Sequence, residues 1–213
     1  MIYLASKSPR RAELLRQINV PFELLLPDAS EDAEALEATI KHEGPAQYVE
    51  RVTRDKLAAA CARFVKRNEQ ATLASDPTSA SHPTLPYFPI LTSDTTVAIG
   101  GTILGKPVST NDAGEMLDRL SGRTHRVITA VALAKGAHHQ HRKVIVQTSR
   151  VTFARIPRSW IDHYISTPEP FDKAGGYGIQ GSISAFVRRI DGSYSGIMGL
   201  PLHETAKLLG KNK

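Results

Sequence analysis

Hydrophobic and polar positions follow one another along the chain in a pattern that predicts strands and helices in alternation. Short apolar runs at residues 2–5, 22–26 and 90–93 are typical of buried strands. Between them, apolar side chains recur at helical spacing along residues 45–65, a segment that opens with a proline. Strand and helix signals that alternate in this way predict an α/β fold.

The second half of the chain continues the pattern, and residues 70–89 interrupt it. Four prolines and six serines or threonines in that interruption predict an exposed, mobile insertion. An acidic, irregular segment is expected at residues 27–44. The remaining predicted strands are 95–99, 102–104, 127–134, 144–153 and 184–190, and the remaining predicted helices are 110–120, 157–166 and 201–209.

Composition narrows the class of protein. The chain has 213 residues and a formal net charge of +6, which fits a polyanionic partner or simply a solvated basic surface. The basic residues are scattered, so a nucleic-acid-binding arm is disfavoured. The single cysteine, Cys61, excludes an intramolecular disulfide and favours a reducing, cytoplasmic location. No apolar run approaches the ~20 residues of a membrane helix, and residues 1–5 read as a strand, not a signal peptide.

The first candidate site is the polar turn between the first strand and the first helix. Ser8 is the expected N-cap, and Pro9 occupies the first helical position. Free backbone N–H groups at a helix start favour an anion. Two hydroxyls (Ser6 and Ser8) and two guanidinium groups (Arg10 and Arg11) strengthen that preference, because arginine matches the geometry of phosphate. The alternative is a capped helix with solvated arginines.

Three further segments carry candidate chemistry. Asp94 is expected at the end of a buried strand, where its carboxylate could bind Mg²⁺, accept a proton from water, or merely begin a turn. The glycine-lysine pair at Lys106 is followed by Pro107, which rules out a Walker phosphate loop but leaves the lysine as a phosphate ligand. Residues 175–181 are glycine-rich, and Gln180 among them could read a base edge or lie in a flexible turn.

Taken together and in this order, these segments resemble the Maf family of nucleotide pyrophosphatases. The resemblance covers nearly the whole chain. It rests on residues 4–11, 48–51, 54–56, 93–97, 104–107, 116–117, 120–125, 172–181, 192–194 and 199–202.

The resemblance implies an α/β fold similar to inosine triphosphatases, with a mixed twisted sheet, flanking helices and two lobes around a deep cleft. It implies one Maf-like domain over residues 1–213 and hydrolysis of a nucleoside triphosphate to the monophosphate and pyrophosphate. A divalent cation, Mg²⁺ or Mn²⁺, would assist. Asp94 matches the family's proposed proton acceptor, and Glu31 matches an acidic position after the second strand. Both would hold the metal, and Lys56 and Lys106 match phosphate-side lysines.

The resemblance also bears on the substrate. The branch similar to dTTP/UTP pyrophosphatases carries arginine, threonine and glutamine at three specificity positions, here Arg10, Thr95 and Gln180. The alternatives are 7-methyl-GTP hydrolysis and a non-catalytic regulator that binds nucleotide or nucleic acid, since the family has been linked to septum formation. The expected substrate-binding residues are Ser6, Ser8, Arg10, Arg11, Thr95 and Gln180.

The sequence departs from the family pattern after the second strand. The family often has paired acids there, whereas Ser30 precedes Glu31 in this chain, so Asp32 is an alternative metal ligand. The insertion at residues 70–89 is also longer than the compact pattern. A nucleoside triphosphate is the expected partner; a homodimer is left open, and no membrane partner is expected.

Overall fold

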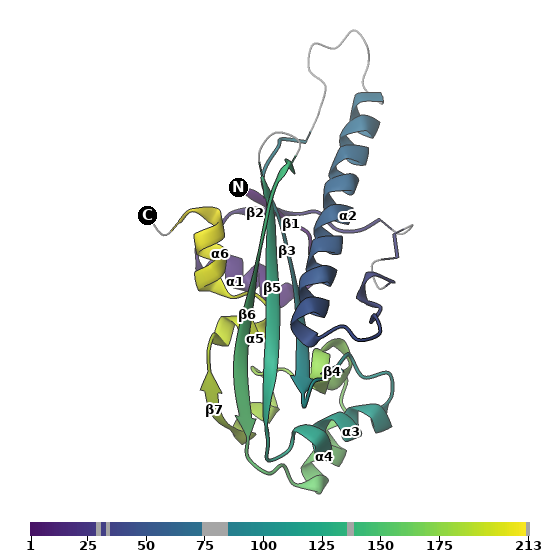
Figure 1. The fold of residues 1–213 in the computed structure, drawn as a ribbon, viewed down its shortest axis with the longest axis vertical. Coiled ribbons are helices and arrows are strands. Elements are labelled where there is room, and N and C mark those ends of the chain that lie inside the picture. Colours follow the sequence, from purple (N-terminus) through teal and green to yellow (C-terminus); the bar gives the residue numbers. More distant parts are fainter. Residues whose placement is uncertain (29–30, 33–34, 74–84, 136–138, 212–213) are drawn as a thin grey trace.

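A seven-stranded mixed sheet forms the centre of the fold in the computed structural model (Figure 1). The described residues are 1–28, 31–32, 35–73, 85–135 and 139–211. The strand order is β2-β1-β3-β5-β6-β7, and β4 pairs with β3. The pairs β1–β2 and β1–β3 are parallel, and the other pairs among the described strands are antiparallel. The strands are β1 (Ile2–Leu4), β2 (Phe22–Leu24), β3 (Ile90–Ile99), β4 (Thr102–Leu104), β5 (Thr124–Lys135), β6 (His141–Phe153) and β7 (Val187–Asp191).

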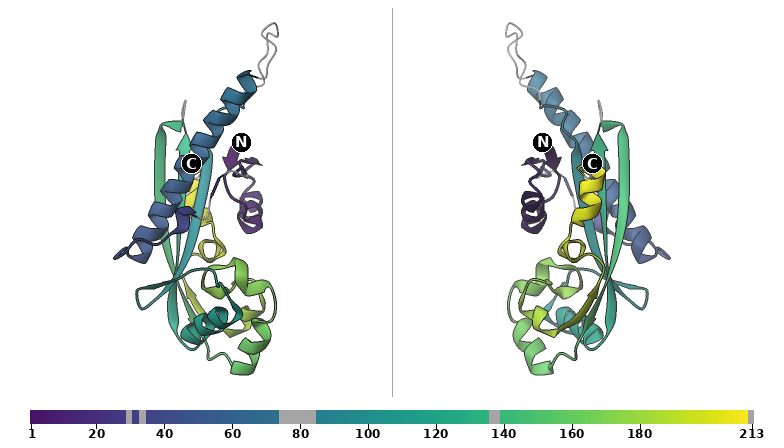
Figure 2. Two further views of the ribbon diagram at one scale, coloured as in Figure 1. Left: turned by 90° about the vertical axis from the view of Figure 1, so that its right-hand side faces the viewer. Right: turned by 90° about the vertical axis from the view of Figure 1, so that its left-hand side faces the viewer.

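Helices cover both faces of the sheet (Figure 2). One face is covered by α2, which packs Tyr48, Val49 and Val52 against Ile128 and Ala130 of β5. The other helices contribute to the larger core on the opposite face. The α-helices are α1 (Pro9–Gln17), α2 (Pro45–Leu73), α3 (Thr110–Leu120), α4 (Arg158–Tyr164), α5 (Tyr194–Met198) and α6 (Leu202–Leu209). The 3₁₀ turns are Ala35–Glu37, Glu169–Asp172, Ala174–Gly176 and Ser182–Phe186. The expected α/β class with a mixed sheet and flanking helices is confirmed.

One expectation about β3 is wrong, and the difference matters for the site. The strand does not end at Asp94 but continues to Ile99, paired with β5 over almost its whole length. The run Thr95–Val97 is β-branched and therefore favours the extended conformation. Because side chains alternate across a strand, Asp94 lies on the face that α2 covers, whereas Ser93 and Thr95 lie on the opposite face.

Other predicted boundaries are also corrected. The helix α2 runs to Leu73, eight residues beyond the predicted end, so residues 70–73 belong to a helix and not to a loop. Residues 74–84 of the expected insertion lie outside the described residues, while Leu85 and Phe88 pack against the core beneath α2. The strand expected at 184–190 starts later, because a 3₁₀ turn precedes β7.

None of the helices in the described part of the chain is long and apolar enough to cross a membrane.

Candidate active site

A break in the strand pairing of β3 opens a cleft at its outer edge. The partner β1 pairs with β3 only as far as Leu91, and the partner β4 begins to pair at Val97. Among the described strands, none pairs with residues 92–96 along that edge. A change of strand partner of this kind is where α/β sheets bind ligands. The cleft there has a volume of about 880 Å³.

The cleft brings together every site residue that the sequence suggested. The turn after β1 forms one side, α2 and the acidic segment form another, and the glycine-rich segment closes a third. The predicted residues that line it are Ser6, Ser8, Arg10, Arg11, Glu31, Lys56, Asp94, Thr95, Lys106 and Gln180.

A chain of four alternating charges lies along the α2 side of the cleft. Lys56 of α2 donates from Nζ to Asp94 Oδ1 at 2.6 Å and to Glu37 Oε1 at 2.8 Å. Lys106, which follows β4, donates from Nζ to Glu37 Oε2 at 3.3 Å. The side chain of Asp94 is 11% exposed and that of Lys56 is 18% exposed, so their attraction is only partly screened. The ammonium group of Lys56 thus bridges two carboxylates.

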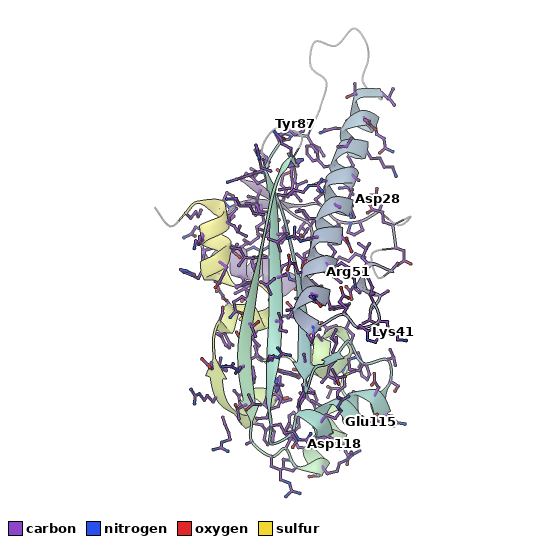
Figure 3. The ribbon with its side chains drawn as sticks, viewed as in Figure 1. Asp28, Lys41, Arg51, Tyr87, Glu115 and Asp118 are labelled. Carbon is purple, nitrogen blue, oxygen red and sulfur yellow. The ribbon has the colours of Figure 1, made fainter. Side chains whose placement is uncertain are left out.

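Of these four charged residues, Glu37 is the one that the sequence did not single out. Contacts with α2 fix its position. The hydroxyl of Tyr48 donates to the backbone carbonyl of Glu37 at 2.9 Å. Arg51, one turn along α2 and labelled in Figure 3, donates to the carbonyl of Ala38 at 2.8 Å and pairs with Glu43. Two side chains of α2 therefore hold the backbone at Glu37 and Ala38.

The electrostatics of this cluster are visible in two pKa shifts. Burial by itself would raise the pKa of Glu37, but Lys56 and Lys106 outweigh it and lower the pKa below the ordinary value. Burial, with the negative charges of Asp94 and Glu37 nearby, raises the pKa of Tyr48 to about 12. Glu37 is therefore a carboxylate, and Tyr48 a neutral hydrogen-bond donor, at neutral pH.

Glu31 lines the same cleft but is engaged elsewhere. Both of its oxygens accept hydrogen bonds from the guanidinium group of Arg63, each at 2.7 Å, and Oε1 also accepts from the backbone N–H of Asp28. The bond from Arg63 is the main reason that the pKa of Glu31 falls to about 2. Arg67, also on α2, donates from Nη2 to Asp28 Oδ1 at 2.7 Å, and Figure 3 shows Asp28 beside α2. These two arginines attach the start of the acidic segment to α2.

The turn after β1 presents one arginine that is locked in place. Arg11 donates from Nε to the carbonyl of Gly199 at 2.9 Å and from Nη1 to Ser6 Oγ at 3.1 Å. Its Nη2 lies 3.5 Å from Thr95 Oγ1, which shares a hydrogen bond with Thr129. Ser8 is the N-cap residue by position, but its side chain makes no capping bond. The N–H of Ser8 itself donates to Ser6 Oγ at 3.2 Å, and both serines line the cleft.

The glycine-rich segment forms the remaining side of the cleft. Asp172, which precedes the segment, pairs with Arg10 Nη1 at 3.5 Å. Gly175 and Gly176 both have positive φ, and a Cβ at Gly175 would lie 2.9 Å from Val97 of β3. Gln180 is exposed and lines the cleft. The segment can approach β3 closely only because it lacks side chains there.

A comparison with protein-family models identifies the family. The model described as Maf-like protein matches residues 1–212. The chain belongs to the Maf family. This membership confirms the resemblance that the sequence motifs indicated.

Relatives match over nearly their whole length. A protein of Cupriavidus metallidurans named dTTP/UTP pyrophosphatase is 54% identical over 209 residues, which cover 98% of this chain and 95% of the relative. A protein of Ralstonia nicotianae with the same name is 52% identical and covers 99% and 93%, respectively. Among solved structures, a HAM1 protein from Coxiella burnetii aligns with 99% of this chain and 98% of its own, at 14% identity and a TM-score of 0.47.

Proposed function

We propose that this Maf-family chain is a nucleoside triphosphate pyrophosphatase that hydrolyses dTTP and UTP to the monophosphate and pyrophosphate. Relatives about half identical over nearly the whole chain carry that name. The observation that carries the proposal is the cluster at Asp94, where Lys56 bridges two carboxylates inside a cleft that is also lined by Arg10, Arg11 and Lys106. Such a site combines cations for a triphosphate with acids for water and metal.

The residues present fit a divalent cation. Mg²⁺ in nucleotide enzymes is commonly held by one or two carboxylates together with substrate phosphates and water. Asp94 and Glu37 offer two carboxylates to one shared cation, the ammonium of Lys56, at 2.6 and 2.8 Å. No cluster of three or more acidic, histidine or cysteine ligands occurs in the described residues, so substrate phosphates and water would supply the other ligands. We therefore assign the metal to Asp94 and Glu37, in place of Glu31.

The proposed reaction divides the work among groups of this chain. The lysines and arginines of the cleft bind the β- and γ-phosphates and stabilise the charge that develops on the leaving pyrophosphate. Asp94 accepts a proton from a water molecule while the oxygen of that water attacks the α-phosphorus. The bond from the α-phosphorus to the bridging oxygen breaks, and pyrophosphate leaves. A bound divalent cation would neutralise phosphate charge and polarise the attacked phosphoryl group.

Base selection is proposed for the opposite side of the cleft. The amide of Gln180 can donate to and accept from a pyrimidine edge. Thr95 lies beside Arg11, and Arg10 is held by Asp172, so these residues would set the distance between base and phosphates. A pocket built for a small ring should hydrolyse purine triphosphates slowly.

The test is release of pyrophosphate from a panel of nucleoside triphosphates in the presence of Mg²⁺ or Mn²⁺. We expect fast release from dTTP and UTP, slow release from GTP and 7-methyl-GTP, and none without a divalent cation. Equal rates with UTP and GTP would contradict the pyrimidine assignment. Release from no nucleotide, with retained nucleotide binding, would favour a non-catalytic regulator over an enzyme.

A further inference from the structure

We propose that His125 is a positioning residue for the nucleoside end of the cleft. Its hydrogen bond to the Tyr177 hydroxyl holds the glycine-rich segment, and this segment carries Gln180. The inference rests on the proposed function, since it concerns how that same cleft holds its nucleotide. His125 lies on β5 and Tyr177 lies in the segment that closes the cleft. The two are 52 residues apart in the sequence.

The bond between the two side chains is short and almost completely buried. His125 Nε2 lies 2.6 Å from the Tyr177 hydroxyl, with His125 2% exposed and Tyr177 5% exposed. The ring of Phe153 contacts both, with centroid distances of 5.0 Å to each. Burial lowers the pKa of His125 to about 4, so the ring is neutral at pH 7. A polar pair in such an apolar site has a fixed geometry, because either partner left alone would be buried without a hydrogen bond.

The segment depends on this contact because it has little regular structure of its own. Its first part is fixed by the N–H of Gly175, which donates to the carbonyl of Gly105 at 2.9 Å, next to Lys106. After the 3₁₀ turn that ends at Gly176, the chain is extended at Tyr177 and does not join the sheet. Two buried side chains, Tyr177 and Ile179, hold the stretch between that turn and Gln180, and Tyr177 adds the hydrogen bond to His125.

The placement gives the pair a particular function. Tyr177 and Gln180 both line the cleft, whereas His125 lies behind them and does not line it. The phosphate-binding cations stand on α1, on α2 and after β4, and none of them contacts His125 through a hydrogen bond or ion pair within the described residues. Loss of the hydrogen bond between His125 and Tyr177 should therefore weaken binding of the nucleoside and leave binding of pyrophosphate unchanged.

The experiment removes the hydroxyl and keeps the ring. With Tyr177→Phe, we expect the KM for UTP and the Kd for UMP to rise about tenfold, which is the loss of one buried hydrogen bond. The kcat and the Ki of pyrophosphate should stay within about twofold, since neither depends on the nucleoside end. His125→Phe should give the same change, and the double variant should be no worse than either single one.

A matched control separates positioning from general loss of stability. Tyr3→Phe also removes a buried tyrosine hydroxyl, one that has no hydrogen-bond partner in the described structure, on the opposite face of the sheet. It should leave KM, Kd and Ki unchanged. A rise in the Ki of pyrophosphate equal to the rise in the KM of UTP would overturn the proposal, as would an unchanged KM.

A second measurement does not depend on catalysis. Amide hydrogen exchange over residues 174–181 should accelerate in Tyr177→Phe and His125→Phe, and not in Tyr3→Phe. If the wild-type chain released no pyrophosphate, the proposed function would fail, and this exchange experiment together with UMP calorimetry would still decide the inference. Unchanged exchange in both cleft variants would refute it.

Discussion

The two sides of the cleft are built from opposite materials. The α2 side consists of ion pairs, in which Lys56, Asp94, Glu37 and Lys106 neutralise one another. On the other side, the glycine-rich segment (residues 175–181) carries no charged residue, although Asp172 and Lys173 precede it. Within it, Tyr177 makes a buried hydrogen bond with His125. Ion pairs can exchange partners when a triphosphate arrives, whereas a packed aromatic cluster has one arrangement. Under the proposed function, the charged side chains that would bind phosphate can exchange partners, whereas the segment that would bind the base is held in one geometry.

The largest expected effect comes from removing the negative charge of Asp94 on the α2 side of the cleft. Asp94→Asn should lower the kcat for UTP by about 10²- to 10⁴-fold, because a general base contributes that much. The melting temperature should change little, since asparagine occupies the same volume and Lys56 keeps Glu37 as a partner. Steady-state kinetics and a melting curve measure both. Asp162→Asn, which removes an exposed carboxylate on α4, is the control and should retain full activity.

The second prediction distinguishes two acids of the α2 side. Glu37→Gln should lower activity about 10- to 100-fold and raise the Mg²⁺ concentration needed, because it removes a charged ligand. Glu31→Gln should mainly lower the melting temperature, since Arg63, which is 6% exposed, loses its charged partner. Metal titrations and melting curves of both variants compare them. If Glu31→Gln removed activity and Glu37→Gln did not, the assignment made from the sequence would stand.

These two acids show how far the sequence could go. The helix start at Ser8 and the helical stripe of α2 follow from local patterns, and both are confirmed. The choice between Glu31 and Glu37 could not follow from local patterns, because both lie in one acidic, irregular segment. It depends on which basic residue of α2 each one meets, Arg63 or Lys56, and that pairing is tertiary.

The hydrogen bond between His125 and Tyr177 could not be predicted from the sequence, for a related reason. Each residue belongs to a motif of the family resemblance, but nothing in either motif indicates that the two side chains meet. Their contact requires the glycine-rich segment to pack on the face of the sheet to which the His125 side chain of β5 points. The end of β3 was misjudged because Asp94 reads as a turn residue, whereas ten residues of β-rich sequence and pairing with β5 keep it inside the strand.

The third prediction concerns the pH dependence of folding stability that His125 contributes on the glycine-rich side of the cleft. The pKa of His125 is about 4 in the folded chain and 6.5 when unfolded, so the unfolded chain binds a proton first as the pH falls. Stability should therefore decrease from pH 6.5 towards pH 4. Between pH 7 and pH 5, the wild type should lose about 2 kcal/mol more than His125→Gln, which cannot titrate. Urea unfolding at each pH measures the difference.

The control for this pH dependence is a histidine in a different setting. His203→Gln removes an exposed imidazole on α6 and leaves the bond between His125 and Tyr177 intact, so the difference attributed to His125 should not appear. Equal slopes for wild type and His125→Gln would mean that burial does not lower the pKa of His125, so that its imidazole gains charge in the folded chain between pH 6.5 and pH 4. The comparison between the two sides would fail on that result.

The smallest expected effect separates the two sides by their response to salt. Added salt screens exposed charges, with a Debye length of about 10 Å at 0.1 M. The side chain of Lys106 is 48% exposed, so phosphate binding should weaken as KCl rises. The KM of UTP and the Ki of pyrophosphate should both increase a few-fold between about 0.05 and 0.3 M KCl. The Ki of uridine, which has no phosphate, should stay constant because residues 175–181, which include Gln180, carry no charge. A uridine Ki that rose in parallel would show that charge also holds the base, and that the two sides bind by the same means.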